Sequence, residues 1–167
     1  MKYQHKIIAL VSAFVLLAAS PSRAQFFVFQ NPLVGEAAPE FKLKNVGGQA
    51  MSLTDFRAGQ STIIFFWATW CPHCREQLKT LKAQKEALTQ KGIKILMVDI
   101  QESPQQVNGY LKKNKIDYEV LLDTDATVAE DYALVGVPTF FFVGADGIIK
   151  AVEHDIPSNY EAILAAK

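Results

Sequence analysis

Neither sign of charge is in excess in this chain. Lys and Arg together number 17, as do Asp and Glu, so the formal net charge is zero and no basic footprint for nucleic acid is present. The chain also lacks internal repeats, low-complexity tracts and a second domain, and its 167 residues suit a single domain. Half of the residues are hydrophobic, which is enough for a sizeable core.

A hydrophobic run long enough to span a membrane is missing as well. The apolar run at residues 7–19 has 13 residues, whereas a membrane helix needs ~20. Lys2 and Lys6 precede this run, and a small-residue cleavage motif ending at Ala24 follows it. We therefore expect residues 1–24 to be a signal peptide that directs export to the periplasm or another extracytoplasmic compartment. The alternative is an uncleaved N-terminal anchor. A lipid-modified N-terminus is excluded, because no cysteine follows the run.

Cysteine and histidine are scarce. The chain has two cysteines, Cys71 and Cys74, and three histidines, of which only His73 lies near them in sequence. A structural zinc site normally needs four ligands, and these residues supply three. A structural disulfide between residues three apart on one helix would close a very small loop and stabilise little. Two alternatives therefore remain open, a redox-active pair and a copper(I) site, since soft sulfur ligands suit that ion.

Strand-like and helix-like segments alternate over residues 35–167, after an extended lead-in at 25–34. Short apolar runs predict strands, and longer stretches with apolar residues on one side predict helices. The expected strands are residues 61–67, 93–100, 118–123, 139–143 and 148–152, with a hairpin around 45–48, and the expected helices are 72–90, 104–114, 126–132 and a last one opened by a capping box at 158–161. This order implies an α/β fold with a mixed central β-sheet flanked by helices on both faces.

The two cysteines lie where a buried strand meets an amphipathic helix. Pro72 suits the first helical turn, where a missing N–H costs nothing. Cys71 then occupies the helix N-terminus, where unpaired amides and the positive end of the helix dipole stabilise a thiolate, the reactive form of the side chain. Cys74 lies one turn later on the apolar side. We therefore predict an exposed nucleophile, Cys71, and a buried resolving partner, Cys74.

His73 stands between the cysteines and is a candidate catalytic residue. It could donate a hydrogen bond to the Cys71 sulfur or carry positive charge beside it, and either effect would favour the thiolate. The alternative is a solvent-facing helix residue with no role in the chemistry.

Several motifs together resemble the thioredoxin superfamily, in particular its exported TlpA/ResA-like branch with an AhpC/TSA-type scaffold. The segment "FFWATWCPHC" is similar to the family's strand, tryptophan and C-x-x-C, and "GVPTFFFV" to its cis-proline segment. An N-terminal β-hairpin and a central strand-helix insertion around 99–122 match the elaborations of this branch. The resemblance covers roughly residues 35–167.

The resemblance implies a thiol–disulfide oxidoreductase whose redox group is its own Cys71–Cys74 disulfide, with no bound cofactor or metal. Cys71 would attack and Cys74 resolve, beside a cis Val137–Pro138 bond. Substrate contacts are implied at three residues, Trp70, Pro72 and Val137, although Trp70 could instead pack in the core. The implied partners are client protein thiols or disulfides and a membrane or exported electron-transfer partner. We expect a monomer.

Two positions depart from the family pattern, and with the residues between the cysteines they leave the direction of electron flow open. Phe65 stands where thioredoxins carry a buried acid, and Gln77 where TlpA/ResA-type reductases carry a glutamate. The proton acceptor for Cys74 is therefore unassigned, with water, His73 and Glu76 as candidates. The Pro-His dipeptide between the two cysteines resembles that of the disulfide-donating oxidase DsbA. The scaffold favours reduction of clients, such as apocytochrome c in cytochrome c biogenesis, over oxidation. A peroxiredoxin is disfavoured, because Ala68 replaces the threonine of the peroxidatic motif.

Overall fold

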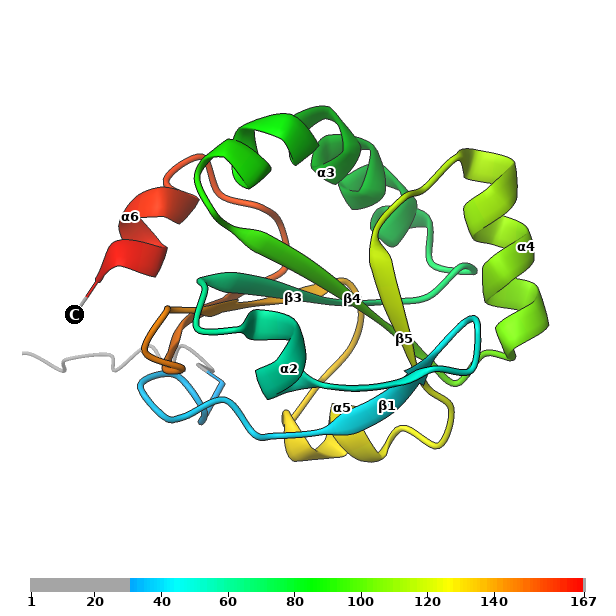
Figure 1. The fold of residues 1–167 in the computed structure, drawn as a ribbon, viewed down its shortest axis with the longest axis horizontal. Coiled ribbons are helices and arrows are strands. Elements are labelled where there is room, and N and C mark those ends of the chain that lie inside the picture. The colour runs from blue at the N-terminus through cyan, green and yellow to red at the C-terminus, as the bar shows by residue number, and fades with distance from the viewer. Residues whose placement is uncertain (1–30, 167) are drawn as a thin grey trace, which may run out of the picture.

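The computed structural model describes residues 31–166 (Figure 1). The expected signal peptide and most of the expected lead-in lie outside the described residues. The remaining part of the lead-in is wrong as predicted, because residues 32–35 form a turn instead of an extended segment. The side chain of Asn31 holds this turn against the carbonyl of Tyr132, at 3.0 Å. Within residues 31–166, no helix has the length and apolar character needed to cross a membrane.

A seven-stranded mixed sheet with the order β2-β1-β5-β4-β3-β6-β7 forms the centre of the molecule. Its strands are β1 (Lys42–Asn45), β2 (Ala50–Ser52), β3 (Thr62–Trp67), β4 (Lys94–Ile100), β5 (Glu119–Asp123), β6 (Thr139–Val143) and β7 (Ile149–Glu153). The three central strands β5, β4 and β3 run parallel, and the other pairings are antiparallel. The predicted mixed sheet and α/β class are confirmed.

Helices cover both faces of the sheet (Figure 1). They are α2 (Leu53–Arg57), α3 (Pro72–Gln90), α4 (Pro104–Asn114), α5 (Thr127–Asp131) and α6 (Tyr160–Ala165). Side chains of α3, α4 and α6 share one hydrophobic core with the sheet, and those of α2 and α5 share the other. Strand β3 contributes alternate residues to both cores, and all six of its residues are buried, which explains why residues 63–67 are apolar without interruption.

Two local predictions are wrong. Helix α2 was not expected, because five residues are too few to show a helical period. It begins at a serine cap, with the Ser52 hydroxyl accepting from the amide of Asp55 at 3.0 Å. The last helix begins at Tyr160 with Asn159 as its N-cap, and no side chain caps it, so the expected capping box is not formed.

Candidate active site

The C-x-x-C pair lies at the junction of β3 and α3, as predicted. Cys71 is the N-cap of α3 and has an extended backbone, and Pro72 occupies the first helical turn. The sulfur of Cys71 accepts a hydrogen bond from the backbone amide of Cys74 at 3.2 Å. One of the helix's unpaired N-terminal amides is thereby satisfied by the sulfur, at the end where the helix dipole is positive.

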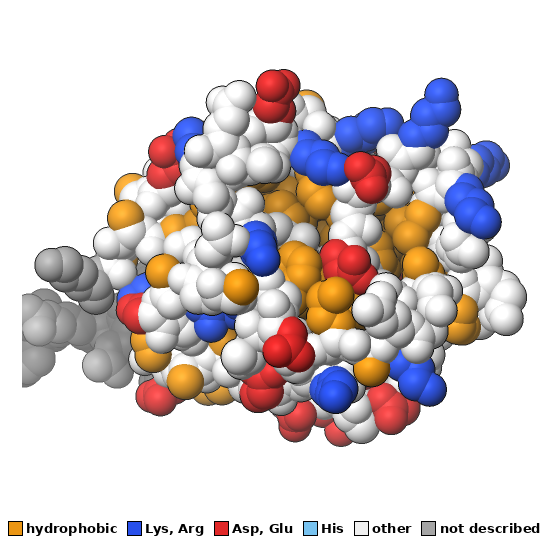
Figure 2. Space-filling view, in the orientation of Figure 1, with side chains coloured by type: hydrophobic (Ala, Val, Ile, Leu, Met, Phe, Trp, Pro, Cys, Tyr) orange, Lys and Arg blue, Asp and Glu red, His pale blue; other side chains and the backbone are white. Residues whose placement is uncertain are grey.

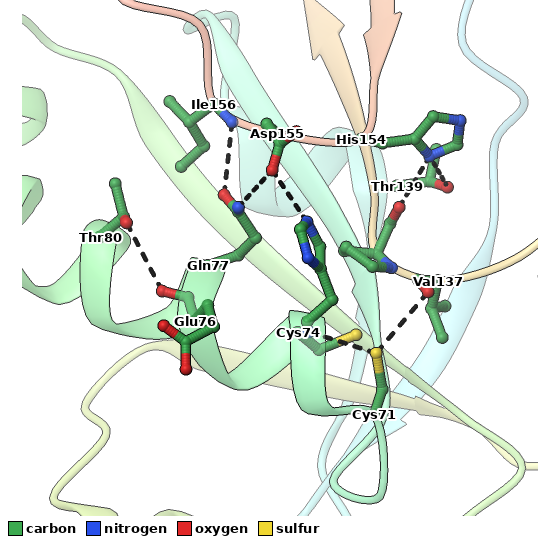
Figure 3. A network of polar contacts seen from close by, with 12 residues as sticks. Cys71, Cys74, Glu76, Gln77, Thr80, Val137, Thr139, His154, Asp155 and Ile156 are labelled. Atoms are coloured by element: carbon green, nitrogen blue, oxygen red, sulfur yellow. Dashed lines mark hydrogen bonds and ion pairs between the residues drawn. The ribbon is translucent and has the colours of Figure 1, made fainter.

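The prediction of an exposed Cys71 is wrong. Its side chain is only 4% exposed, because the loop before β6 covers it. The Cys71 thiol donates to the carbonyl oxygen of Val137 at 3.6 Å (Figure 3). The bond between Val137 and Pro138 is cis. Segments 66 residues apart in sequence therefore meet at the sulfur.

Cys74 is fully buried on the α3 face of the sheet, as predicted. Burial, together with the hydrogen bond that its thiol donates to the neighbouring Cys71 sulfur, raises the pKa of the Cys74 thiol far above its ordinary value. Cys74 therefore stays protonated at neutral pH. The two sulfurs therefore differ in environment: Cys71 accepts an amide hydrogen bond at the start of α3, whereas Cys74 is buried with its proton.

His73 does not contact the Cys71 sulfur, so the predicted hydrogen bond is not made. Its Nε2 lies 2.9 Å from Oδ1 of Asp155, in the loop between β7 and α6. Both side chains are more than half exposed. In this structure the solvent-facing alternative describes His73 better than the sulfur-bonded one.

Gln77, which takes the place of the family's glutamate, is joined to the same aspartate. Its side-chain amide donates to Oδ1 of Asp155 at 2.5 Å, and its carbonyl accepts from the amide of Ile156 at 3.4 Å (Figure 3). Gln77 is nearly buried, whereas Glu76 is exposed and pairs with Lys79 at 3.2 Å. The sequence analysis did not identify Asp155 as a site residue, because it lies 78 residues from Gln77 in the chain.

A buried acidic pair stands behind the active-site loop, and the sequence analysis missed it. Glu102 accepts hydrogen bonds from the backbone amide of Thr69 at 2.5 Å and from its hydroxyl at 2.6 Å. Asp99, at the end of β4, is 1% exposed. Burial, and next the charge of Glu102, raise the pKa of Asp99 to about 9. The available signal was an acid within the apolar run of β4, three residues before another acid.

The expected substrate-contacting residues surround the sulfur on the surface. Trp70 is 63% exposed, so its alternative role in the core is wrong. Val137 and Pro138 line a shallow hollow of about 370 Å³ together with His73 and His154. Pro72 is exposed and lines a groove between α3 and α4.

No cluster of three or more metal-ligating side chains occurs within residues 31–166. Cys71 and Cys74 are both free thiols in the structure. Bonded to each other they form the disulfide that the sequence predicts as the redox group.

Comparison with known proteins agrees with this geometry. Residues 34–152 match the AhpC/TSA family, and the chain belongs to that family. It is 30% identical over 119 residues to the thiol-disulfide oxidoreductase ResA of Bacillus subtilis, a match that spans 71% of this chain and 66% of ResA. It is 26% identical over 173 residues to ResA of Geobacillus thermodenitrificans, spanning 98% of this chain and 99% of that protein.

Solved structures give the same assignment. The thioredoxin domain of a thiol-disulfide oxidoreductase from Bacteroides vulgatus superposes with a TM-score of 0.69 at 26% identity, over 78% of this chain and 94% of that domain. StoA from Bacillus subtilis, at 24% identity, has the same fold with a TM-score of 0.62, over 79% of this chain and 97% of StoA. The chain is thus a thioredoxin-like thiol–disulfide oxidoreductase of the TlpA/ResA-like type.

Proposed function

We propose that this protein is exported and exchanges disulfides with protein clients, chiefly by reducing them. The observation that carries the proposal is the unequal pair at the start of α3. The Cys71 sulfur receives the amide hydrogen bond of Cys74, and the Cys74 thiol is kept protonated by burial. An attacking and a resolving sulfur need this difference.

The reaction begins when the Cys71 thiolate attacks one sulfur of a client disulfide. The client S–S bond breaks, a mixed disulfide forms and one client thiolate leaves. Cys74 then loses its proton and attacks the Cys71 sulfur, which releases the second client thiolate and leaves the Cys71–Cys74 disulfide. Both client thiolates take up protons. A dithiol partner, exported or in the membrane, re-reduces the pair by the same exchange.

The surface around Cys71 supports a protein client in particular. An extended client strand can pair with the backbone that precedes Pro138, in the manner of strand addition to a sheet edge. Trp70, which precedes Cys71 in the chain, offers an exposed apolar side chain. Apocytochrome c is the first client to test, since the TlpA/ResA resemblance implies it.

Disulfide donation is the alternative direction, and the Cys-Pro-His-Cys dipeptide is its support. A thiolate stabilised by the dipeptide histidine would make the disulfide more oxidising. His73 bonds to Asp155 and donates no hydrogen bond to the Cys71 sulfur, however, so this support for donation is weaker in this chain. We therefore favour reduction.

Measuring the reduction potential of the Cys71–Cys74 pair tests the direction. A value near the ~ −270 mV of thioredoxin supports reduction, and a value near the ~ −120 mV of DsbA overturns it. Insulin reduction and refolding of reduced ribonuclease should agree with the potential, with Cys71→Ser as the inactive control. If both assays fail and the reduced protein binds copper(I) through Cys71, the protein is instead a copper(I)-binding metallochaperone.

A further inference from the structure

A groove of about 400 Å³ runs between α3 and α4, beginning at Pro72 beside the attacking cysteine. Its apolar wall consists of Leu78, Tyr110 and Ile116 together with Pro72. Leu78 is buried, and the other three side chains are partly or fully open to solvent. The groove lies on the α4 side of α3, whereas the network of Gln77 and Asp155 lies on the α6 side. The groove is therefore separate from the Gln77–Asp155 network.

The rim of the groove is positively charged. Arg75, Lys79 and Lys82 line it, and Glu76 is the one acidic residue among its lining residues. Glu76 pairs with Lys79, but Lys82 and Arg75 donate to neutral backbone carbonyls, at 3.3 and 3.1 Å. Two of the three positive charges therefore have no acidic partner within the groove lining.

This concentration of charge is local, since positive and negative residues balance over the whole chain. Figure 2 shows Lys and Arg side chains gathered over α3 and α4, with hydrophobic side chains between them. A surface of this kind attracts negative charge and offers an apolar floor to whatever the charge brings in.

We propose that the groove binds an acidic, apolar segment of the client polypeptide that lies next to the cysteine under attack. The proposal rests on the proposed function, because the occupant is the client of the same reaction. Pro72 follows Cys71 directly, so a client joined to Cys71 by a mixed disulfide has its neighbouring residues at the mouth of the groove. Carboxylates of the segment face the cations of the rim, and its apolar side chains cover Tyr110 and Ile116.

The length of the groove sets the length of the segment. From Pro72 to Lys82 the helix advances about 15 Å, at ~1.5 Å per residue. An extended peptide covers ~3.3 Å per residue, so the groove accommodates about four to five residues. The recognised feature is thus a short run with one or two apolar side chains and acidic neighbours, placed close to the client cysteine.

The test compares reduction of three substrates by the full chain. The first is a peptide disulfide flanked by an acidic, apolar run; the second carries lysines in place of the acids; the third is bis(2-hydroxyethyl) disulfide, which is small and neutral. The variant is Lys79→Glu with Lys82→Glu, and Lys42→Glu with Lys44→Glu on β1 is the matched control with the same change in charge. Both control lysines are exposed and far along the sheet from α3.

The groove variant should lose about tenfold or more in kcat/KM for the acidic peptide, because the charge of Lys82 is reversed and Glu76 loses the Lys79 charge that neutralises it, so the rim repels acids. The kcat/KM of the groove variant for the lysine peptide and for the neutral disulfide should equal that of the parent protein. The control variant should have the kcat/KM of the parent for all three substrates. Raising the salt concentration should shrink the difference between the two peptides for the parent protein.

Equal losses with the groove and control variants would show that general charge is responsible, and would overturn the proposal. Unchanged kcat/KM of the groove variant for the acidic peptide would also overturn the proposal. So would a groove variant that no longer binds phosphatidylglycerol vesicles but reduces both peptides equally well, because the groove would then be a membrane-binding surface. Failure of the parent protein to reduce the neutral disulfide would refute the proposed function, irrespective of the groove.

Discussion

Replacing Asp99 by asparagine should stabilise the protein progressively as the pH rises. The carboxyl of Asp99 is buried beside Glu102, and both of its oxygens lack a hydrogen-bond partner within the described residues. Burial and the charge of Glu102 raise its pKa from 3.8 to about 9. In the folded protein Asp99 therefore keeps its proton at neutral pH, whereas in the unfolded chain it ionises above pH 3.8.

The sign and size follow from proton linkage. Below pH 3.8 both states hold the proton and nothing is lost. Between pH 3.8 and about 9 only the folded state holds it, so the free energy of unfolding falls by ~1.4 kcal/mol per pH unit. At pH 7 the accumulated loss is about 4 kcal/mol, a large share of the 5–15 kcal/mol typical of a domain. Asparagine has nearly the same shape as aspartate and does not titrate in this range. The free energy of unfolding of Asp99→Asn therefore does not fall with pH in the way that of the parent protein does.

Urea denaturation of the reduced protein at several pH values between 4 and 9 measures the effect. The two proteins should have similar stability at pH 4. At pH 7 the variant should have a urea midpoint higher by about 2 M, for a slope of ~2 kcal/mol/M. Asp117→Asn is the matched control. Lys85 lowers the pKa of this exposed carboxyl, so Asp117 titrates below pH 4 and its replacement should give a stability difference that does not change between pH 4 and 9. A stability difference between Asp99→Asn and the parent that does not change with pH would refute the reasoning.

Three further predictions concern the active site. At pH 7, iodoacetamide should modify Cys71 of the reduced protein at least tenfold faster than Cys74, because burial raises the pKa of the Cys74 thiol. Mass spectrometry of the labelled peptides measures the two rates. Equal rates would contradict the prediction. His73→Ala should change the rate of Cys71 alkylation less than about threefold, since His73 bonds to Asp155 and not to sulfur; a larger fall in that rate would restore the sequence-based role. Trp70→Ala should lower kcat/KM for a protein disulfide about tenfold, with the free energy of unfolding changed by less than ~0.5 kcal/mol, because the ring is 63% exposed. Equal losses with a protein and with a small neutral disulfide would argue against a client-binding role for Trp70.

Local pattern was sufficient to predict most of the fold. The apolar run of β3 and the stop and start signals around α3 depend on neighbours within a few residues, and these elements were placed within one residue of their observed ends. The position of Cys71 at a helix N-terminus follows from Pro72 alone. Helix α2 was not predicted, because five residues are too few to show the hydrophobic period of a helix. The serine that caps it was the one local sequence signal for this helix.

The environment of the reactive sulfur was decided by the tertiary structure. Cys71 is covered because β6 pairs with β3 and brings Val137 to it from 66 residues away. His73 and Gln77 share Asp155 for the same kind of reason, since the chain after β7 returns along α3.

What the amino-acid sequence determined by itself is the order of strands and helices, the mixed sheet and the identity and position of the two cysteines. These depend on short-range sterics, hydrophobic period and backbone capping. Which cysteine is covered, which partner each polar side chain finds and which acid keeps its proton were decided only by the fold. Those properties depend on burial and on contacts between segments distant in the chain, and no local pattern encodes either one.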